Sequence, residues 1–440
     1  MLRPTGFADL AGRRVGIFGY GVEGRATHRR LLGLARSLVL VDDAPGRGRD
    51  VLVTTDGGHE ALLTCDAVVK SPGIPRRRPD VLDLEDHGVA VCSALNLWLH
   101  DVDRSRVVAV TGTKGKSTTT ALIAFLLQCV GDDAHRVGNS GLPPYDPQVD
   151  DRHGWLVVEV SSYQCVDVDV APSLVVVTSL GADHLDWHGS LEQYHDDKLS
   201  LTRTEGWHRT LVADQPALRA AADRLGGDVT YVAPDDGGLA RVLGLLGAHN
   251  ESNVALALAA VTAMTERARD DVVTAAAERA ASFSPLPGRL TLVATRARDE
   301  GTVRFVDDGL ATAPLPTLAA LAVFADEPVA LIAGGFDRGV DYADLGEALA
   351  ARQPATTLVT MGEAGRRLAD VTRERAPHVA QYRAETMGEA VAHAVAALGE
   401  RGVVLLSPAA PSFDRYRDWE ERSRDFAHEV HRSLGRDSNP

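Results

Sequence analysis

The chain has 440 residues, of which 45% are hydrophobic and 24% are charged, and its formal net charge is −15. At roughly 150 residues per domain this length predicts two or three domains, and the composition excludes a fibrous or largely disordered protein. The acidic balance argues against nucleic acid as a partner, because binding to a polyanion depends on clustered Lys and Arg.

The N-terminal segment MLRPTGFADLAGRRVGIFGY lacks the apolar core of a signal peptide. No stretch reaches the roughly 18 apolar residues of a membrane span, so we expect a cytoplasmic protein that does not bind membranes. Its cysteines lie far apart without a CxxC pair, which favours reduced, mostly buried thiols over a zinc site or disulfide framework. They are Cys65, Cys92, Cys129 and Cys165.

Short Val, Ile and Leu runs alternate with Ala-, Leu- and Arg-rich segments of helical period along the chain. This pattern is typical of parallel strands joined by crossover helices, and the predicted fold class is α/β. Residues 13–43 form the first unit: a strand, a glycine turn, a helix and a second strand that ends at Asp42 and Asp43. A further strand in DAVVKSPGIP stops at the turn that begins at Ser71.

Two segments predict domain boundaries. Residues 100–106 are polar and precede a strongly apolar strand, and residues 284–290 contain two prolines and a glycine that interrupt a helical pattern. We therefore predict three domains, at residues 1–102, 103–290 and 291–440.

The first glycine turn, GYGVEG, places Gly19, Gly21 and Gly24 at GxGxxG spacing directly after a strand, with Asp42 about 20 residues on. Glycines there allow a tight turn and let a diphosphate approach a helix N-terminus closely. A nicotinamide cofactor and a UDP group both fit this pattern. A βα turn without a ligand stays an alternative.

The second glycine turn, TGTKGKST, covers residues 111–118 and predicts a nucleotide triphosphate site. Backbone N–H groups from Gly112 to Lys116 can surround phosphate oxygens, Lys116 can neutralise the β and γ phosphates, and Ser117 or Thr118 can supply an oxygen to Mg²⁺. Val110 stands where the usual G-x-x-x-x-G-K-[ST] spacing has its first glycine.

Candidate metal ligands follow two apolar strands. Glu159 ends the strand WLVVE, and a carboxylate on a buried strand is costly unless it is paired, protonated or bound to a cation. We predict a metal ligand, with a cap or salt bridge as the alternative. The DHLDWH cluster, with His184, could hold zinc or manganese, yet one His and one Glu suffice for the Mg²⁺ that accompanies ATP.

Three other polar residues of this region have solvent exposure as their default expectation. They are Asp186 and His188 of the DHLDWH cluster, and Lys198, which follows Asp196 and Asp197.

With these residues identified, the chain resembles the Mur ligases, in particular the type that adds glutamate in peptidoglycan synthesis. The resemblance covers nearly the whole chain, because eleven motifs occur in the family's order. They are GYGVEG, SPGIP, GTKGKST, VGNSGLP, EVSSYQ, DHLDWH, QYHDDKL, GAHNESN, LPGR, AGGFDRGVDY and SPAAPSFDRYRDWEERSRDF.

The resemblance implies three domains of Mur ligase architecture, with a Rossmann-like first and third domain. The first holds the UDP of a UDP-N-acetylmuramoyl-L-alanine substrate, the second holds ATP with two Mg²⁺ ions, and the third brings the amino acid, glutamate. An acyl phosphate then forms on the alanine carboxylate and is attacked by the amine. An epimerase that acts on the product is the one implied protein partner.

The resemblance also assigns roles by motif. Lys116, Glu159, His184 and Lys198 form the catalytic set; Ser117, Glu159, His184 and Lys198, the last as a carbamate, form the metal set. The ATP-binding set is Gly112, Thr113, Lys114, Gly115, Lys116, Ser117, Thr118, Asn250, Asn253, Arg289 and Asp308. The UDP-substrate set is Gly19, Gly21, Val22, Glu23, Asp42, Ser71, Gly73, Asn139, Ser161 and Gln164. The glutamate-binding set is Thr312, Arg338, Ser412, Phe413 and Trp419.

Several positions depart from the family's pattern. The Asp-Ser-Lys-Ala-Thr-Asn segment, here residues 308–313, has lost its lysine and asparagine, and Arg338 replaces a lysine that would reach a glutamate carboxylate. Lys114 replaces an asparagine, Ala44 an arginine, and Trp419 a phenylalanine. Inverting the stereocentre of glutamate turns its carboxylate and side chain in new directions, so the altered anchors favour the branch of the family that adds L-glutamate over the D-glutamate enzyme.

Two other classes remain as alternatives. An NAD-dependent oxidoreductase would explain GYGVEG and Asp42. It would give no function to the phosphate loop, Glu159 and Lys198. A catalytically silent scaffold would explain the altered third domain. The intact catalytic set argues against it, namely Lys116, Glu159, His184 and Lys198. We expect a monomer.

Overall fold

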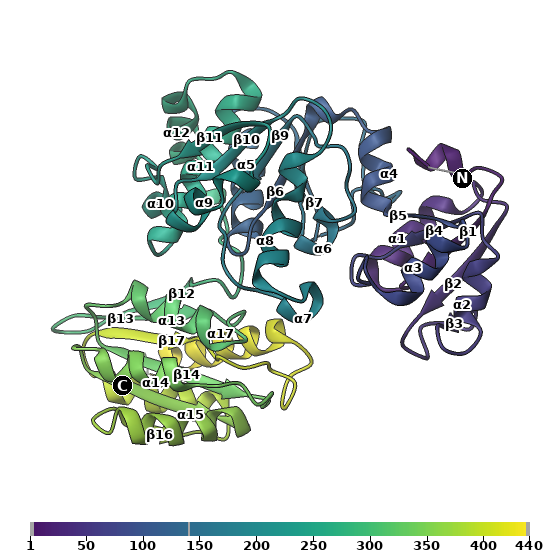
Figure 1. Cartoon of the computed structure of the whole chain (residues 1–440). Coiled ribbons are helices and arrows are strands. Elements are labelled where there is room, and N and C mark those ends of the chain that lie inside the picture. The colour runs from purple at the N-terminus through teal and green to yellow at the C-terminus, as the bar shows by residue number, and fades with distance from the viewer. Residues whose placement is uncertain (1–3, 140, 437–440) are drawn as a thin grey trace. The chain divides into compact units, whose positions relative to one another are not determined.

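The computed structural model describes residues 4–139 and 141–436. Ser140 of the VGNSGLP motif lies outside these residues. So do residues 1–3 of the predicted first domain and residues 437–440 of the predicted third domain. The predicted α/β class is confirmed, because three sheets alternate with helices along the chain (Figure 1). The chain forms two compact units, Met1–Leu239 with His249–Phe283, and Ala240–Ala248 with Ser284–Pro440.

The first sheet is parallel, with strand order β3-β2-β1-β4-β5. The central strand β1 is almost wholly buried, as expected for a strand covered on both faces. The strands are β1 Arg14–Phe18, β2 Ser37–Asp42, β3 Val51–Val53, β4 Ala67–Lys70 and β5 Ala90–Cys92. The helices are α1 Val22–Leu31, α2 Gly58–Leu63, α3 Pro79–Asp86 and α4 Ala94–Asp101.

The second sheet is also parallel, with order β11-β10-β9-β6-β8-β7, so β6, β8 and β9 end at one edge. Its strands are β6 Val107–Thr111, β7 Ala134–Gly138, β8 Trp155–Glu159, β9 Leu174–Val177, β10 Arg209–Ala213 and β11 Asp228–Val232. The helices along this part of the chain are α5 Lys116–Cys129, α6 Ser162–Cys165, α7 Leu185–His188, α8 Leu191–Leu199, α9 Pro216–Ala220, α10 Leu239–Val242, α11 Ala248–Thr265 and α12 Arg269–Glu278.

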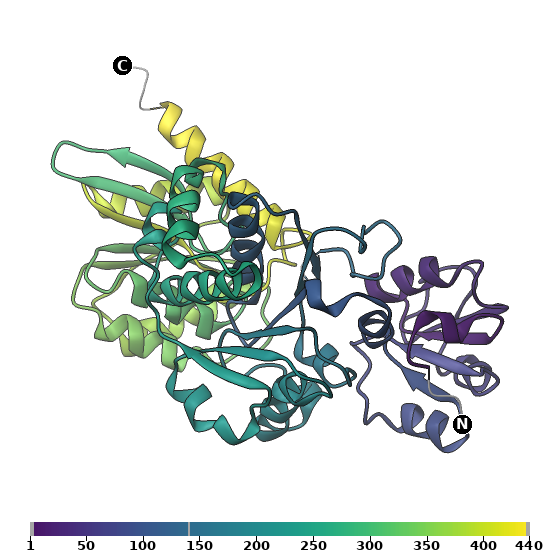
Figure 2. The ribbon, with the colours of Figure 1, turned by 90° about the horizontal axis from the view of Figure 1, so that it is seen from above.

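The third sheet has the order β12-β13-β17-β14-β15-β16, and only β12 runs antiparallel to its neighbour. Its strands are β12 Thr291–Ala297, β13 Thr302–Asp307, β14 Val329–Gly335, β15 Thr356–Met361, β16 Ala380–Arg383 and β17 Gly402–Leu406. The helices are α13 Pro314–Val323, α14 Ala343–Ala351, α15 Gly362–Arg375, α16 Met387–Leu398 and α17 Trp419–Arg436. The long helix α17 forms the yellow end of the chain (Figure 2).

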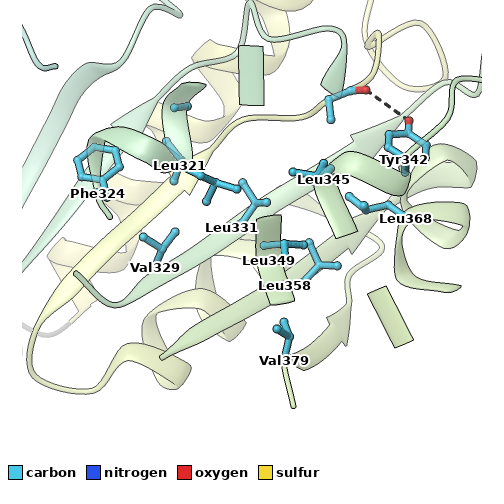
Figure 3. Close-up of a cluster of buried hydrophobic side chains, with 14 of the residues drawn as sticks. Leu321, Phe324, Val329, Leu331, Tyr342, Leu345, Leu349, Leu358, Leu368 and Val379 are labelled. Carbon is cyan, nitrogen blue, oxygen red and sulfur yellow. Dashed lines mark hydrogen bonds between the residues drawn. The ribbon is translucent and has the colours of Figure 1, made fainter. Parts of the chain in front are cut away.

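Alternate residues of the third sheet supply its two cores. Leu331 packs with α13, α14 and α15 on one face (Figure 3), whereas the next residue, Ile332, packs with α16 and α17 on the other. This alternation follows from the period of two in a strand, and it explains why the strands read as continuous apolar runs. No helix among the described residues is long and apolar enough to cross a membrane. All four cysteines are free, as predicted.

Candidate active site

The second glycine turn joins β6 to α5, and two of its glycines are required by close packing. Gly112 has φ 138°, and a Cβ there would lie 2.1 Å from Thr178 Oγ1. Gly115 has φ 91°, and a Cβ there would lie 2.5 Å from Asn253 Oδ1. Larger residues would therefore push the loop away from the end of β9 and from α11. The fold thus brings Asn253, which the resemblance assigned to ATP, against the phosphate loop.

Helix α5 begins at Lys116, directly after this loop. The Nζ of Lys116 donates to the carbonyl oxygens of Gly112 at 2.9 Å and Thr113 at 3.2 Å. Ser117 and Thr118 are buried in the first helical turn. The N-terminus of a helix carries partial positive charge and free N–H groups, so this turn can bind phosphate oxygens.

The phosphate loop is also held by Ser179 and Tyr194, which the sequence did not single out. The backbone N–H of Lys114 donates to Ser179 Oγ at 2.8 Å, and its Nζ pairs with Asp183 at 3.1 Å. The Thr113 hydroxyl is hydrogen-bonded to the Tyr194 hydroxyl at 2.9 Å. Ser179 follows β9, and the adjacency of β9 to β6 was the signal that could have located it.

Lys198 is 2% exposed, so the default expectation of a solvated lysine is wrong. Its Nζ donates to the Gly112 carbonyl oxygen at 2.9 Å and lies 5.1 Å from the centre of the Tyr194 ring. Burial, together with the nearby positive charge of Lys116, lowers the pKa of Lys198 to about 7. The buried face of α8 accounts for the difference, because Tyr194 and Lys198 are four residues apart on it.

Glu159 ends β8 and is 2% exposed. Its Oε1 accepts a hydrogen bond from Asn139 Nδ2 at 3.3 Å, while its buried Oε2 has no hydrogen-bond partner among the described residues. A buried carboxylate oxygen without a donor is costly, and a divalent cation would remove that cost. Glu159 at the edge of the sheet that carries the phosphate loop therefore fits Mg²⁺, and its role as a metal ligand stays a prediction.

The DHLDWH segment does not form the alternative zinc or manganese site. Within residues 4–139 and 141–436, no three His, Cys, Asp or Glu side chains are grouped so that they could hold a metal ion. His184 is half-exposed and has φ 50°, a left-handed conformation that costs energy in a residue other than glycine. Its ring centre lies 5.0 Å from that of Tyr163.

His188 is buried, contrary to the expectation of a solvated loop. Its Nδ1 lies 2.7 Å from Asp197 Oδ2, and its Nε2 lies 3.0 Å from Ser162 Oγ. The guanidinium of Arg77 donates two hydrogen bonds to the same carboxylate, at 2.9 and 3.1 Å. Burial opposes the charge on Asp197, but these partners prevail and lower its pKa. The network joins the loop before α3 to helices α6, α7 and α8.

A cavity of about 420 Å³ opens beside the first glycine turn. All ten residues of the predicted UDP-substrate set line it, although they come from both the first and the second sheet; their contact with a substrate stays a prediction. The lining includes Gly19, Gly21, Val22, Glu23, Asp42, Ser71, Gly73, Asn139, Ser161 and Gln164. Through Asn139 the cavity is connected to Glu159.

Asp42 lines this cavity but serves the local backbone. Its carboxylate oxygens accept hydrogen bonds from the N–H groups of Tyr20 at 2.6 Å and Ala44 at 2.9 Å. An NAD-dependent oxidoreductase would need the Asp42 carboxylate to bind ribose. Here a ribose hydroxyl would compete with two backbone N–H groups for that carboxylate.

The predicted third-domain residues belong to the second compact unit. Asp308 Oδ2 accepts a hydrogen bond from Ser407 Oγ at 2.7 Å, and burial raises the pKa of Asp308 to about 7. Arg289 precedes β12, which pairs with the strand that Asp308 follows. The Arg338 guanidinium lies 5.7 Å from the centre of the exposed Phe413 ring.

The remaining glutamate-set residues differ in environment. Ser412 is buried and Thr312 is half-buried. Trp419 packs on the LPGR turn, because a Cβ at Gly288 would lie 2.6 Å from its ring.

Sequence reasoning missed Arg422, which lies in the last motif, SPAAPSFDRYRDWEERSRDF. Its side chain is buried and donates to the backbone carbonyl oxygens of Ala410 and Gly309, each at 3.0 Å. The motif contains several other arginines and acidic residues, so its local pattern gave no sign that this one would be buried.

Comparison with known proteins agrees with this arrangement. A family model described as the Mur ligase middle domain matches residues 110–233. A protein of Micromonospora sp. is 38% identical over 97% of this chain and 98% of its own length, and one of Xanthomonas euvesicatoria is 38% identical over 96% and 95%. Both are named UDP-N-acetylmuramoyl-L-alanine–L-glutamate ligase.

Solved structures resemble the fold at low identity. The MurF ligase of Thermotoga maritima in complex with ADP has a TM-score of 0.56 and 14% identity, covering 98% of this chain and 97% of that one. The MurC ligase of the same organism has a TM-score of 0.53 and 18% identity, covering 96% and 100%. These two likenesses concern the fold alone.

The fold is α/β with parallel sheets, as in the Mur ligases of known structure. With relatives at 38% identity over nearly its full length, the chain belongs to the Mur ligase family, whose members form ADP.

Proposed function

We propose that this ligase joins L-glutamate to the alanine carboxylate of UDP-N-acetylmuramoyl-L-alanine in peptidoglycan synthesis, with conversion of ATP to ADP and phosphate. The observation that carries the proposal is the hydrogen bond from Asn139, in the cavity beside the first glycine turn, to Glu159, at the edge that carries the phosphate loop. This link supports the proposal that a carboxylate bound in the cavity lies near a phosphate bound by the loop. The names of the relatives contain the same two substrates and so support the proposal.

The proposed reaction has two steps. A carboxylate oxygen of the substrate attacks the γ-phosphorus of ATP, and ADP leaves, giving an acyl phosphate. The neutral amine of glutamate then attacks the acyl carbon; phosphate leaves, the amine gives up a proton, and an amide remains. Both steps bring anions together, so cationic groups must offset their repulsion.

Several residues of this chain would together offset the repulsion between these anions. Lys116 would neutralise phosphate charge from the first turn of α5, and the N–H groups at the start of that helix would bind phosphate oxygens. Ser117, Glu159, His184 and carbamylated Lys198 would hold Mg²⁺, which supplies further charge neutralisation when bound. The backbone strain at His184 is consistent with a side chain held for such a role.

The preference for L-glutamate rests on the anchors of the second compact unit. Arg338 presents a planar guanidinium above Phe413, and such a fork binds a carboxylate in two parallel hydrogen bonds, as a lysine cannot. The lysine and asparagine of the family's segment at residues 308–313 are absent. When the amines of L- and D-glutamate occupy the same position, their carboxylates point in different directions. The changes at the carboxylate-binding positions therefore favour L-glutamate over D-glutamate.

ADP formation tests the proposal. The purified chain is incubated with ATP, Mg²⁺ and UDP-N-acetylmuramoyl-L-alanine, with L-glutamate, D-glutamate or no amino acid, and the products are identified by mass spectrometry. We expect ADP and a glutamyl product with L-glutamate, and neither with Lys116→Ala. A product with D-glutamate alone would overturn the stereochemical part, and no product with either would overturn the whole proposal.

A further inference from the structure

Glu23 lies at a point where the first glycine turn meets the segments after β7 and β8. It is the second residue of α1, and its Oε1 accepts a hydrogen bond from Gln164 Nε2 at 2.8 Å. The Tyr145 hydroxyl donates to its Oε2. Gln164 Oε1 in turn accepts a hydrogen bond from the Ser161 N–H at 2.8 Å. The carboxyl group of Glu23 therefore fixes the amide of Gln164 on the wall of the cavity.

The surroundings of Glu23 disfavour a negative charge there. Among the residues that the structure describes, no Lys or Arg forms an ion pair with it, and its two hydrogen-bond partners are uncharged. Burial accordingly raises the pKa of Glu23 to about 7. A neutral acid fits the same contacts, because one oxygen still accepts from Gln164 and the other can donate to the Tyr145 oxygen.

Other charged groups near this end of the cavity are already engaged. Arg29 pairs with Asp146, Arg47 lies 3.5 Å from Asp42, and Asp43 pairs with Arg78. The titratable and charged groups around Glu23 on α1, on the strand ends and on the segment 139–164 are Arg25, His28, Arg29, Asp42, Asp43, Arg47, Tyr145, Asp146 and Tyr163.

A diphosphate bound at this turn would occupy the cavity that Glu23 also lines. Glu23 is in the first turn of α1, where free N–H groups favour an anion, and the diphosphate needs the same N–H groups. Two anions near one helix N-terminus repel each other, and the repulsion is stronger the less water lies between them. Protonation of Glu23 removes the competitor.

We propose that Glu23 couples substrate binding to proton uptake: the UDP-linked substrate occupies the cavity with Glu23 as the neutral acid, and ionised Glu23 opposes binding. This inference rests on the proposed function for the identity of the substrate. It adds a role for Glu23 beyond lining the cavity, because the side chain makes the affinity for substrate depend on pH.

The sign of the pH dependence follows from linkage. Well below pH 7 Glu23 is already protonated, so binding takes up almost no proton and the affinity is nearly constant. Above pH 7 each binding event takes up as much as one proton, and the Kd for substrate rises by a factor that approaches about tenfold per pH unit. Replacing Glu23 by Gln keeps the size and the hydrogen bonds of the neutral acid while it removes the titration.

Calorimetry without ATP tests the proposal on the full chain. UDP-N-acetylmuramoyl-L-alanine is titrated at pH 6, 7, 8 and 9 in two buffers of different ionisation enthalpy, so that the number of protons taken up is measured. We expect proton uptake that is small at pH 6 and rises towards one proton at pH 9 in the unaltered protein, no uptake with Glu23→Gln, and tighter binding by that variant than by the unaltered protein at pH 9. Asp43→Asn is the matched control: the Arg78 pair lowers the pKa of Asp43, so this variant should keep the proton uptake.

Tyr145→Phe provides a second variant that keeps the carboxyl group. It removes a donor to Glu23, so the onset of proton uptake should move to higher pH. Binding without proton uptake above pH 7, or the same uptake in Glu23→Gln, would overturn the inference and leave the proposed function standing. Absence of substrate binding at every pH would overturn both.

Discussion

The Nζ of Lys198 donates a hydrogen bond to the carbonyl oxygen of Gly112 at 2.9 Å, and the Nζ of Lys116 donates to that same oxygen at 2.9 Å. Two lysines from different helices thus meet at one carbonyl of the phosphate loop. Their mutual repulsion and the burial of Lys198 favour its neutral form, and a neutral amine is the form that reacts with carbon dioxide.

We predict that Lys198 forms a carbamate. With a pKa of about 7, about half of these amines are neutral at pH 7. Bicarbonate labelled with ¹³C should give a carbamate signal in the NMR spectrum that Lys198→Arg lacks, because a guanidinium stays charged. The signal should decline as the pH falls below 7, since protonation removes the reactive amine. A spectrum of the unaltered protein without this signal would contradict the prediction.

Replacing Glu159 by Gln should separate stability from activity. The buried Oε2 has no hydrogen-bond donor among the described residues, so removal of the charge should raise the free energy of unfolding by about 1 kcal/mol without Mg²⁺. The same change should reduce ADP formation by about 10²-fold or more. Thermal unfolding with and without Mg²⁺ and ATP, together with turnover, checks both effects. A less stable variant that keeps full turnover would show that Glu159 has a structural role only.

Asp197→Asn should destabilise the network around His188. The carboxylate accepts hydrogen bonds from Arg77, His188 and Gln193, so its loss should cost about 1–3 kcal/mol. Because these partners lower the pKa of Asp197, its contribution is present above the ordinary value of 3.8 and is lost as the pH falls through the lower folded value. Urea unfolding at pH 7 and at pH 3 should therefore show a smaller difference between the two proteins at pH 3.

The half-exposed Arg77 provides the comparison for this measurement. Arg77→Ala removes a partner whose side chain is 54% exposed, so we expect a smaller loss of stability than for Asp197→Asn. An equal loss in both variants would contradict the view that the buried carboxylate is the centre of the network.

Arg338→Lys should weaken the binding of L-glutamate. The planar fork becomes a point charge, so we expect the KM for glutamate to rise by about tenfold while the KM for the UDP-linked substrate stays the same. Steady-state kinetics with each substrate varied in turn measures both constants. An unchanged KM for glutamate would show that Arg338 does not bind the glutamate carboxylate.

Local patterns were enough to predict much of the site. The glycines of both turns and the strand that ends at Glu159 were predicted from short stretches of sequence. Parallel strands end at one edge, and this rule explains why the phosphate loop and Glu159 share an edge of the second sheet.

Burial that depends on distant residues could not be predicted. His188 and Lys198 lie in polar stretches, and only the packing of α6, α7 and α8 shows that they are buried. The contact between Glu23 and Tyr145 spans 122 residues. Trp419 and Gly288 are likewise far apart in the chain, so no local pattern placed the ring on that turn.

The most direct test of the central claim is the configuration of the glutamate that the protein incorporates. The chain is supplied with ATP, Mg²⁺, UDP-N-acetylmuramoyl-L-alanine and racemic glutamate; the nucleotide product is isolated and hydrolysed, and its glutamate is separated on a chiral column. We predict L-glutamate. Recovery of D-glutamate would contradict the account.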